Sequence, residues 1–112
     1  MSDCLFCSIV EGEVPATVVS ESDRVLAFRD IAPQAPVHIV VVPKEHYADI
    51  AVLASNDQDL VGELIAEAAL VAAEEGYDDF RLVFNTGADA GQSVFHVHAH
   101  VLAGRTFAWP PG

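Results

Sequence analysis

Residues 37–42 limit what this chain can fold into more than any other short stretch. Five of these six residues are valine or isoleucine, a run typical of a strand that is buried on both faces. Pro33 and Pro36 come just before the run, and a helix cannot cross them because proline lacks an N–H donor and has a fixed φ. The run therefore predicts a strand inside a sheet with a packed layer on each side.

Short apolar runs bounded by turn residues predict the other strands. Residues 17–20 and 24–29 flank a turn-like segment at residues 21–23, so we expect a hairpin there. Residues 86–92 contain two glycines and are typical of a loop. We thus expect five strands, over residues 17–20, 24–29, 37–42, 80–85 and 94–102.

Helical spacing marks one long helix. Four apolar residues recur at a period near 3.6, and they are Leu60, Leu64, Ala68 and Val71. Asn56 or Asp57 can cap the start of this helix, and Gly76 can end it. Residues 4–10 predict a short helix, and residues 47–54 fit either a short helix or an irregular segment. Strands and helices in runs, without strict alternation, predict an α+β fold on a mainly antiparallel sheet.

The last predicted strand carries three of the five histidines of the chain, His96, His98 and His100. They alternate with small or β-branched apolar residues, which favours one apolar face and one imidazole face. Residues two apart on a strand lie roughly 6.5 to 7 Å apart on the same side, so one extended ligand could meet all three rings. The alternative is a row of surface imidazoles on a solvated strand.

Length and composition favour a single domain over residues 1–112. The chain is 52% hydrophobic, too apolar for disorder, and no apolar run approaches the ~18 residues that a membrane span needs. Residues 1–10 lack the basic and apolar regions of a secretory signal. We therefore expect a soluble cytoplasmic protein with no membrane partner.

The charge of the chain bears on its partners. Five Lys and Arg residues against 17 Asp and Glu residues give a formal net charge of −12 at pH 7. Such a field repels a phosphate backbone, so binding of nucleic-acid polymers is disfavoured. A single nucleotide is different, because local dipoles and histidines inside a pocket can hold its phosphate.

Several motifs together resemble one family. Residues 96–102 follow the pattern His-φ-His-φ-His-φ-φ, where φ is apolar, and residues 91–93 read Gly-Gln-Ser just before it. Residues 30–38, residues 43–46 and the terminal Trp-Pro-Pro-Gly of residues 109–112 complete the set. In this order the segments resemble the Hint branch of the histidine triad (HIT) nucleotide hydrolases and transferases, and the likeness spans nearly the whole chain.

The resemblance implies a fold and an activity. The fold is a five-stranded sheet with one long and one short helix, which pairs with a second copy into a continuous ten-stranded sheet. The activity is hydrolysis of the P–N bond of purine nucleoside 5′-phosphoramidates, the amides of AMP or GMP. The resemblance implies a catalytic set made of His98 as nucleophile with His100, His96, His38 and Ser93. Without the resemblance, a lone histidine at the start of a buried strand, such as His38, is more often a core residue whose hydrogen bonds are satisfied.

The resemblance also implies which residues hold the nucleotide. They are Asp30, Phe28, Ile31, Leu5, Phe6, Val14, Val40, Asn85, Gly91, Gln92, Ser93, His98 and His100. Asp30 would meet the ribose hydroxyls and the apolar members would line the purine pocket. The alternatives are that Asp30 is a turn residue at a strand end and that the apolar members are ordinary core residues.

Four residues form a candidate zinc site: Cys4, Cys7, His46 and His96. A Cys-x-x-Cys pair with two histidines from elsewhere suits tetrahedral zinc, and many bacterial members of the family carry such a structural zinc. The alternative is that Cys4 and Cys7 are two small apolar residues under a helix. No organic cofactor is expected.

Two features concern assembly and rival functions. The two prolines of the tail should make it leave the sheet as an extended arm. By resemblance it would reach the site of a partner copy, whereas the alternative packs Trp109 on its own core. The rival functions are hydrolysis of dinucleoside polyphosphates and a non-catalytic nucleotide-binding or zinc-binding module.

Overall fold

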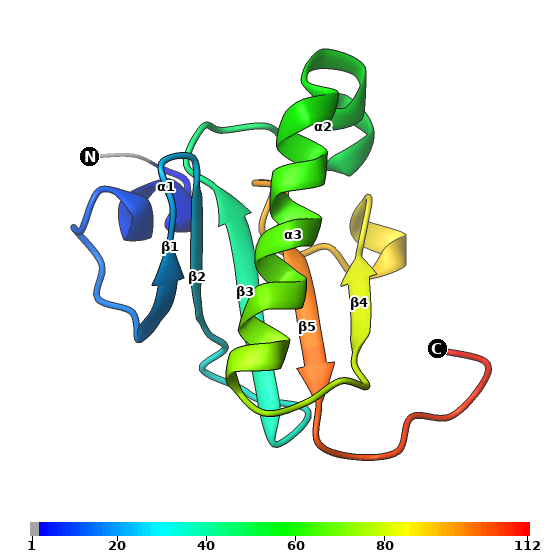
Figure 1. Cartoon of the computed structure of the whole chain (residues 1–112). Helices are drawn as coiled ribbons and strands as arrows, with labels where there is room; N and C mark the ends of the chain where they lie inside the picture. The colour runs from blue at the N-terminus through cyan, green and yellow to red at the C-terminus, as the bar shows by residue number, and fades with distance from the viewer. Residues whose placement is uncertain (1–2) are drawn as a thin grey trace.

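Five strands form one antiparallel sheet in the order β1-β2-β3-β5-β4 in a computed structural model that describes residues 3–112 (Figure 1). The strands are β1 (Val18–Glu21), β2 (Val25–Arg29), β3 (Val37–Pro43), β4 (Arg81–Phe84) and β5 (Ala99–Ala103). The helices are α1 (Leu5–Val10), α2 (Ile50–Asn56) and α3 (Gln58–Glu74), with a 3-10 turn η1 (Ala88–Ala90). Met1 and Ser2 belong to the predicted single domain but lie outside the described residues. The predicted α+β fold is confirmed.

The long helix α3 covers one face of the sheet. Its predicted apolar stripe is confirmed, because all four members are at most 1% exposed: Leu60, Leu64, Ala68 and Val71. Asp57 is the cap of the two predicted alternatives, since its Oδ1 accepts from the Leu60 N–H at 3.1 Å. Gly76 follows the last turn with a φ of +91°, a conformation that glycine adopts without strain.

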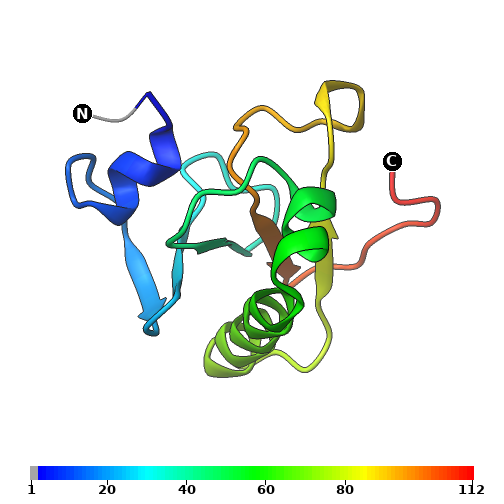
Figure 2. The same ribbon diagram turned by 90° about the horizontal axis from the view of Figure 1, so that it is seen from above.

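The short helix α1 covers the opposite face beside β2 and β3 (Figure 2). Phe6 of α1 packs there with Leu26, Phe28, Val40 and Val42 in a second apolar cluster. Every residue of β3 is therefore buried, with α3 on one side and α1 on the other. This arrangement confirms that residues 37–42 form a strand buried on both faces.

The prediction of a strand over residues 94–102 is wrong in its first half, because β5 begins only at Ala99. The ladder between β3 and β5 ends at the pair Val41 and Ala99. Pro43, at the end of β3, has no N–H to extend the ladder. The Val97 N–H instead donates to the Tyr47 carbonyl at 2.7 Å, outside the sheet.

This change of path separates the three histidines. His96 and His98 precede the strand, and only His100 lies within β5. His96 is 0% exposed and His98 is 7% exposed, which rules out a row of surface imidazoles on a solvated strand.

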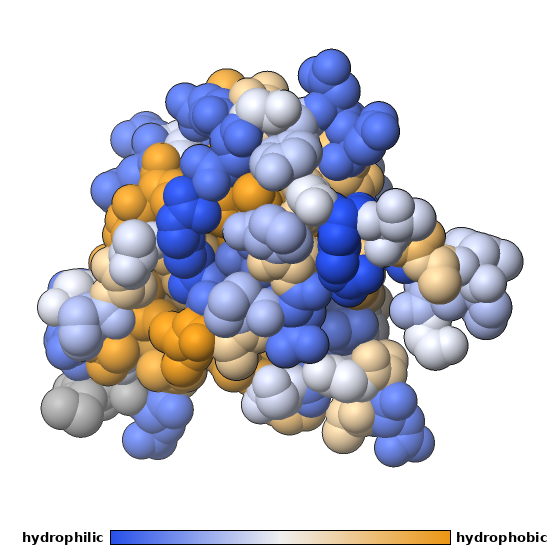
Figure 3. Space-filling view, turned by 90° about the horizontal axis from the view of Figure 1, so that it is seen from below, coloured by the Kyte–Doolittle hydropathy of each residue, from blue (hydrophilic) through white to orange (hydrophobic). Residues whose placement is uncertain are grey.

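The C-terminal tail leaves the sheet beyond β4 (Figure 1). Trp109 is 84% exposed, so it does not pack on the core of its own chain. Seen from below, apolar side chains gather on the side of the N-terminus, and the tail projects on the other side (Figure 3). No helix within residues 3–112 combines the length and the apolar character that crossing a membrane requires.

Candidate active site and metal site

An apolar cavity of about 330 Å³ lies between α1, the end of β2 and the segment before β5. Ten of the predicted nucleotide-binding residues line it, and they are Leu5, Phe6, Val14, Phe28, Asp30, Ile31, Val40, Ser93, His98 and His100. Phe6 contacts Phe28 and His98 edge to face, with ring centroids 5.5 and 4.9 Å apart. The cavity thus combines an apolar wall with two imidazoles and one carboxylate.

Five further residues line the cavity that sequence reasoning missed: Ile9, Pro15, Ala16, Arg29 and Val94. Ile9 lies one helical turn after Leu5, so the helical spacing of α1 could have predicted it. Val94 adjoins the predicted Ser93. Pro15 and Ala16 reach the cavity through the loop after α1, and no local pattern in the sequence marks them.

Backbone contacts fix the tautomer of His98. Its Nδ1 lies 2.8 Å from the carbonyl oxygen of His96, and because a carbonyl only accepts, Nδ1 must carry the proton. A neutral ring then has its lone pair on Nε2, and no described residue hydrogen-bonds to that nitrogen. His98 therefore presents a nucleophilic nitrogen while its other nitrogen is anchored.

A second pair of histidines forms a directed chain. The Gln34 N–H donates to Nδ1 of His38 at 3.0 Å, so this nitrogen is the acceptor and a neutral His38 carries its proton on Nε2. His38 Nε2 lies 2.9 Å from Nδ1 of His100, which must accept. His100 consequently carries its proton on its own Nε2. We call the Gln34 N–H, His38 and His100 the histidine chain.

Burial keeps these rings neutral. Desolvation lowers the pKa of His98 below its ordinary 6.5, although its bond to the His96 carbonyl opposes the effect. Burial, followed by the nearby His98 and His38, lowers the pKa of His100 to about 4. Burial also lowers the pKa of His38, against a smaller opposing effect of Asp30. The neutral tautomers described above for the three rings are therefore the ones expected near pH 7.

Three predicted nucleotide-binding residues lie outside the lining of the cavity. The Gln92 amide is buried and donates to the carbonyls of Ala48 and Val94, while its Oε1 accepts from the Gly87 N–H. Gly91 has a φ of +98°, and Asn85 lies against it. These contacts brace the loop that presents Ser93, and a direct contact of the three residues with nucleotide stays a prediction.

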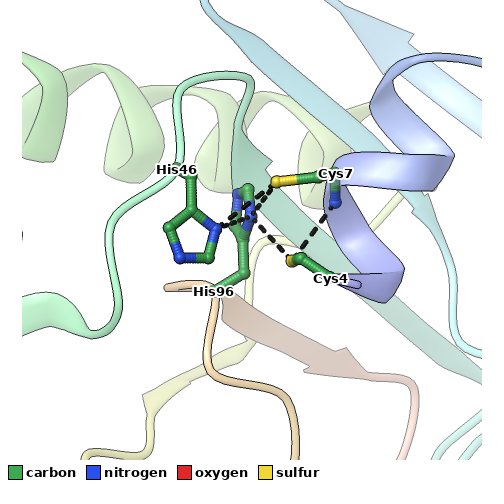
Figure 4. Close-up of side chains that lie close together, drawn as sticks. All are labelled: Cys4, Cys7, His46 and His96. Atoms are coloured by element: carbon green, nitrogen blue, oxygen red, sulfur yellow. Dashed lines mark hydrogen bonds between the residues drawn. The ribbon is translucent and has the colours of Figure 1, made fainter. Parts of the chain in front are cut away.

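The four predicted metal ligands converge at the start of α1, and we call them the metal cluster (Figure 4). Cys4 and Cys7 come from α1 and its cap, His46 follows β3, and His96 precedes β5. Their ligand atoms all lie within 4.8 Å of one another. His96 donates from Nε2 to the Pro43 carbonyl at 2.8 Å, so its Nδ1 lone pair faces the cluster.

The distances in the metal cluster fit zinc. His96 Nδ1 lies 3.4 and 3.5 Å from Sγ of Cys4 and Cys7 and 3.1 Å from Nδ1 of His46. Tetrahedral bonds of about 2.3 Å to sulfur and about 2.0 Å to nitrogen would give ligand separations of about 3.5 and 3.3 Å. One cation could therefore bind all four ligand atoms together.

A second group of possible ligands does not fit a metal. Asp30 Oδ2 lies 3.4 Å from Nε2 of His38 and 4.0 Å from Nδ1 of His100. A metal on Nε2 of His38 would move the proton to Nδ1, where it would face the Gln34 N–H. Since a donor would then oppose a donor, this group suits hydrogen bonding to a substrate better than metal binding.

Comparisons with known proteins agree with this geometry. The model of the HIT domain matches residues 11–107. The 14 kDa zinc-binding protein of Brassica juncea is 46% identical over 113 residues, 98% of this chain and 100% of that protein. Adenylylsulfatase HINT1 of Arabidopsis thaliana is 45% identical over 114 residues, 99% of this chain and 78% of that protein.

Solved structures give the same result. The crystal structure of a HIT family hydrolase from Legionella pneumophila superposes with a TM-score of 0.94 at 47% identity. It covers 98% of this chain and 100% of the other. The match to the HIT domain, the full-length relatives and this superposition together show that the chain belongs to the HIT domain family.

Proposed function

We propose that this protein hydrolyses nucleotides at phosphorus, cleaving the P–N bond of purine nucleoside 5′-phosphoramidates through a covalent intermediate on His98. One observation carries the proposal. The Nδ1–H of His98 is held by the His96 carbonyl, so its Nε2 lone pair is directed away from that anchor on a ring that lines the cavity. A buried neutral imidazole fixed in this tautomer is suited to attack an electrophilic phosphorus.

The reaction would proceed in two balanced steps. The Nε2 lone pair of His98 forms a bond to the α-phosphorus, the P–N bond to the amine breaks, and the departing amine takes up a proton. Water then forms a P–O bond, the bond between phosphorus and Nε2 of His98 breaks, and the proton that the water loses returns to the group that protonated the amine, giving the nucleoside monophosphate. His100 carries its proton on Nε2, so it can donate to a phosphate oxygen or to the leaving group, and Ser93 offers a second donor.

The cavity suits the nucleoside half of the substrate. Its apolar lining would hold the purine between Phe6, Phe28 and Val40, and its volume lies within the usual range for a small-ligand site. Asp30 follows β2 at the rim, where a carboxylate can accept from the ribose hydroxyls. The negative net charge is no obstacle, because the groups nearest the phosphate are neutral donors.

We also propose that the metal cluster holds one structural zinc ion. Cys4 and Cys7 would bind as thiolates, and His46 and His96 through Nδ1. A closed site with four protein ligands supplies cross-linking and no open position for substrate. Zinc would thus fix α1, and with it the Phe6 wall of the cavity, to the segment that precedes β5.

The proposal includes a homodimer of single-domain chains in the cytoplasm. The outer edge of β4 has no strand partner among the described residues, and all four residues of β4 are only half-buried. Phe80, just before β4, adds exposed apolar surface. A second copy that pairs along this edge would cover that surface and extend the sheet.

A second substrate class deserves a direct comparison. The Arabidopsis relative is named an adenylylsulfatase, and the same attack on phosphorus could expel sulfate instead of an amine. Dinucleoside polyphosphates would offer a third leaving group at the same phosphorus. The three substrates share the adenosine half and differ only in the group that departs.

The test is turnover of three substrates under one set of conditions. An adenosine 5′-phosphoramidate, adenylyl sulfate and diadenosine tetraphosphate are compared by kcat/KM for AMP release, with and without a chelator. We expect the phosphoramidate to react fastest and mass spectrometry of quenched protein to find AMP on His98. Faster turnover of either of the other substrates would replace the proposed reaction. No turnover of any of them would favour a binding module.

A further inference from the structure

Arg105 lies on the surface after β5, outside the cavity, yet a series of contacts joins it to the histidine chain. We propose that Arg105 is a positioning residue that sets which nitrogen of His100 carries the proton. It would act through the backbone of Gln34 and the ring of His38. The inference rests on the proposed function for its catalytic consequence, while its structural part concerns tautomers alone.

The contacts form one line of donors and acceptors. Arg105 Nε donates to the Gln34 carbonyl at 2.9 Å, across 71 positions of sequence. The N–H of the same Gln34 donates to Nδ1 of His38 at 3.0 Å. His38 Nε2 then donates to Nδ1 of His100 at 2.9 Å. Each of the last two links leaves only one nitrogen of the ring that accepts it available for the proton of that ring.

Gln34 lies in an exposed loop between β2 and β3, where its own side chain donates to the Ala32 carbonyl at 3.0 Å. The loop has one anchor at its base, where the Asp30 N–H donates to the His38 carbonyl at 3.0 Å. A second anchor comes from the chain after β5, where Gly104 packs so closely that an added Cβ would lie 2.9 Å from Cβ of Pro36. Arg105 is the next residue, so residues 104–105 clamp this loop at two successive points.

Arg105 is itself held by an aromatic ring. Its guanidinium lies 4.2 Å from the centroid of the Phe107 ring, and its Nη1 donates to the Thr106 carbonyl at 3.1 Å. Arg81 of β4 covers the same ring at 5.1 Å and donates to the Ala108 carbonyl at 3.0 Å. The two arginines therefore share Phe107, but of the two only Arg105 hydrogen-bonds to Gln34.

Loss of the clamp has a defined chemical effect. If the Gln34 N–H moves away, Nδ1 of His38 no longer faces a donor and can carry the ring proton, although the Asp30 carboxylate, 3.4 Å from Nε2, opposes this change. In that form Nε2 has a lone pair. That lone pair would face the lone pair on Nδ1 of His100 at 2.9 Å, an arrangement that His100 can relieve by moving its own proton to Nδ1. His100 would then have no proton on Nε2 to donate in the cavity.

The experiment compares two arginine variants that touch the same ring. Arg105→Met removes the donor to Gln34. Arg81→Met is the matched control, because it removes the other side of the stack and the bond to the Ala108 carbonyl but no contact with Gln34. Nitrogen-15 NMR of the histidine side chains reports the tautomers of His38 and His100 with AMP bound and needs no turnover. We expect Arg105→Met to populate the Nδ1–H form of both rings and Arg81→Met to leave them as in the unmodified protein.

Kinetics add a second readout. Loss of one hydrogen-bonded link should lower kcat about threefold to tenfold for Arg105→Met, while AMP affinity changes less than about twofold. Arg105→Lys keeps a donor and should recover most of kcat. Unchanged tautomers in Arg105→Met, or equal effects of both Met variants, would overturn the inference. A tautomer shift in a protein that turns over no substrate would uphold the positioning role and overturn the proposed function.

Discussion

The metal cluster and the histidine chain both contain histidine side chains, but the two sites use the imidazole lone pairs differently. In the metal cluster, two sulfur atoms and two Nδ1 atoms converge within 4.8 Å, and several of them offer lone pairs to the same point. In the histidine chain, each of the two Nδ1 lone pairs already meets a donor. The first arrangement favours binding of a cation. In the second, each hydrogen bond determines which nitrogen of the next ring donates, as far as His100 in the cavity.

The difference comes from the backbone. The Pro43 carbonyl takes the Nε2 proton of His96 and so turns the Nδ1 lone pair toward the cysteines. The Gln34 N–H occupies Nδ1 of His38 and so makes Nε2 a donor. A carbonyl at one histidine and an N–H at the other thus decide which group of ligands suits zinc.

The largest expected effect tests the cavity side of this comparison. His98→Ala removes the proposed nucleophile, so turnover of an adenosine 5′-phosphoramidate should fall at least about a thousandfold. AMP binding should stay within about tenfold, because the base and ribose contacts lie elsewhere. The measurement is kcat together with AMP affinity by calorimetry. Activity above a few per cent would show that His98 is not the nucleophile.

Metal content tests the other side. Purified protein should carry about one zinc ion per chain, and Cys4→Ser with Cys7→Ser should abolish it and lower Tm by at least about 5 °C. Elemental analysis and thermal unfolding measure both quantities. His38→Gln is the control, because it changes the histidine chain and should leave the zinc content at one. Two zinc ions per chain, or none in protein purified without chelator, would contradict the comparison.

The pH dependence of kcat should show a smaller effect. His98 must be neutral to attack, and its pKa is lowered by burial, so the protein should stay active below the pH at which an exposed histidine is half protonated. As pH falls, kcat should decline only once it passes through this lowered pKa. Initial rates between pH 4 and 8 should therefore show an acid midpoint below 6.5. A midpoint at or above 6.5 would mean that burial does not govern the reacting group.

The smallest effect concerns the tail. Removing residues 109–112 leaves Phe107 and its two arginines in place but removes the exposed Trp109. If the tail borders the leaving group in a partner's site, kcat/KM for a bulky aromatic amide should change relative to a small alkyl amide. AMP affinity should change by less than about 1 kcal/mol. An equal loss for both amides, in protein of checked dimer content, would limit the tail to a role in stability.

The spacing of apolar residues correctly predicted the elements whose burial follows a regular period. The β-branched run of β3 and the 3.6-residue stripe of α3 each record burial by neighbouring layers, so both appear in the sequence as periodicity. The family resemblance supplied the lining of the cavity, for example Leu5 and Ile31, which no periodicity marks as ligand contacts.

The remainder depends on contacts between distant residues. The path of residues 94–98 is set by the carbonyls of Tyr47 and Pro43, and alternation of apolar residues carries no trace of either. The bond between Arg105 and Gln34 spans 71 positions and uses a backbone oxygen, which every residue has. Tautomers are therefore beyond a pattern of residue types, because a backbone partner specifies them.

His96 links the metal cluster to His98 in the cavity. Its Nδ1 faces the cysteines, while its carbonyl holds Nδ1 of His98 at 2.8 Å. Order gained on one side of this residue reduces the freedom left to lose on the other, so ligands on the two sides share a coupling free energy. Such coupling is reciprocal: if zinc raises the affinity for nucleotide by some factor, bound nucleotide raises the affinity for zinc by the same factor. A chelator titration with and without AMP would read that factor directly.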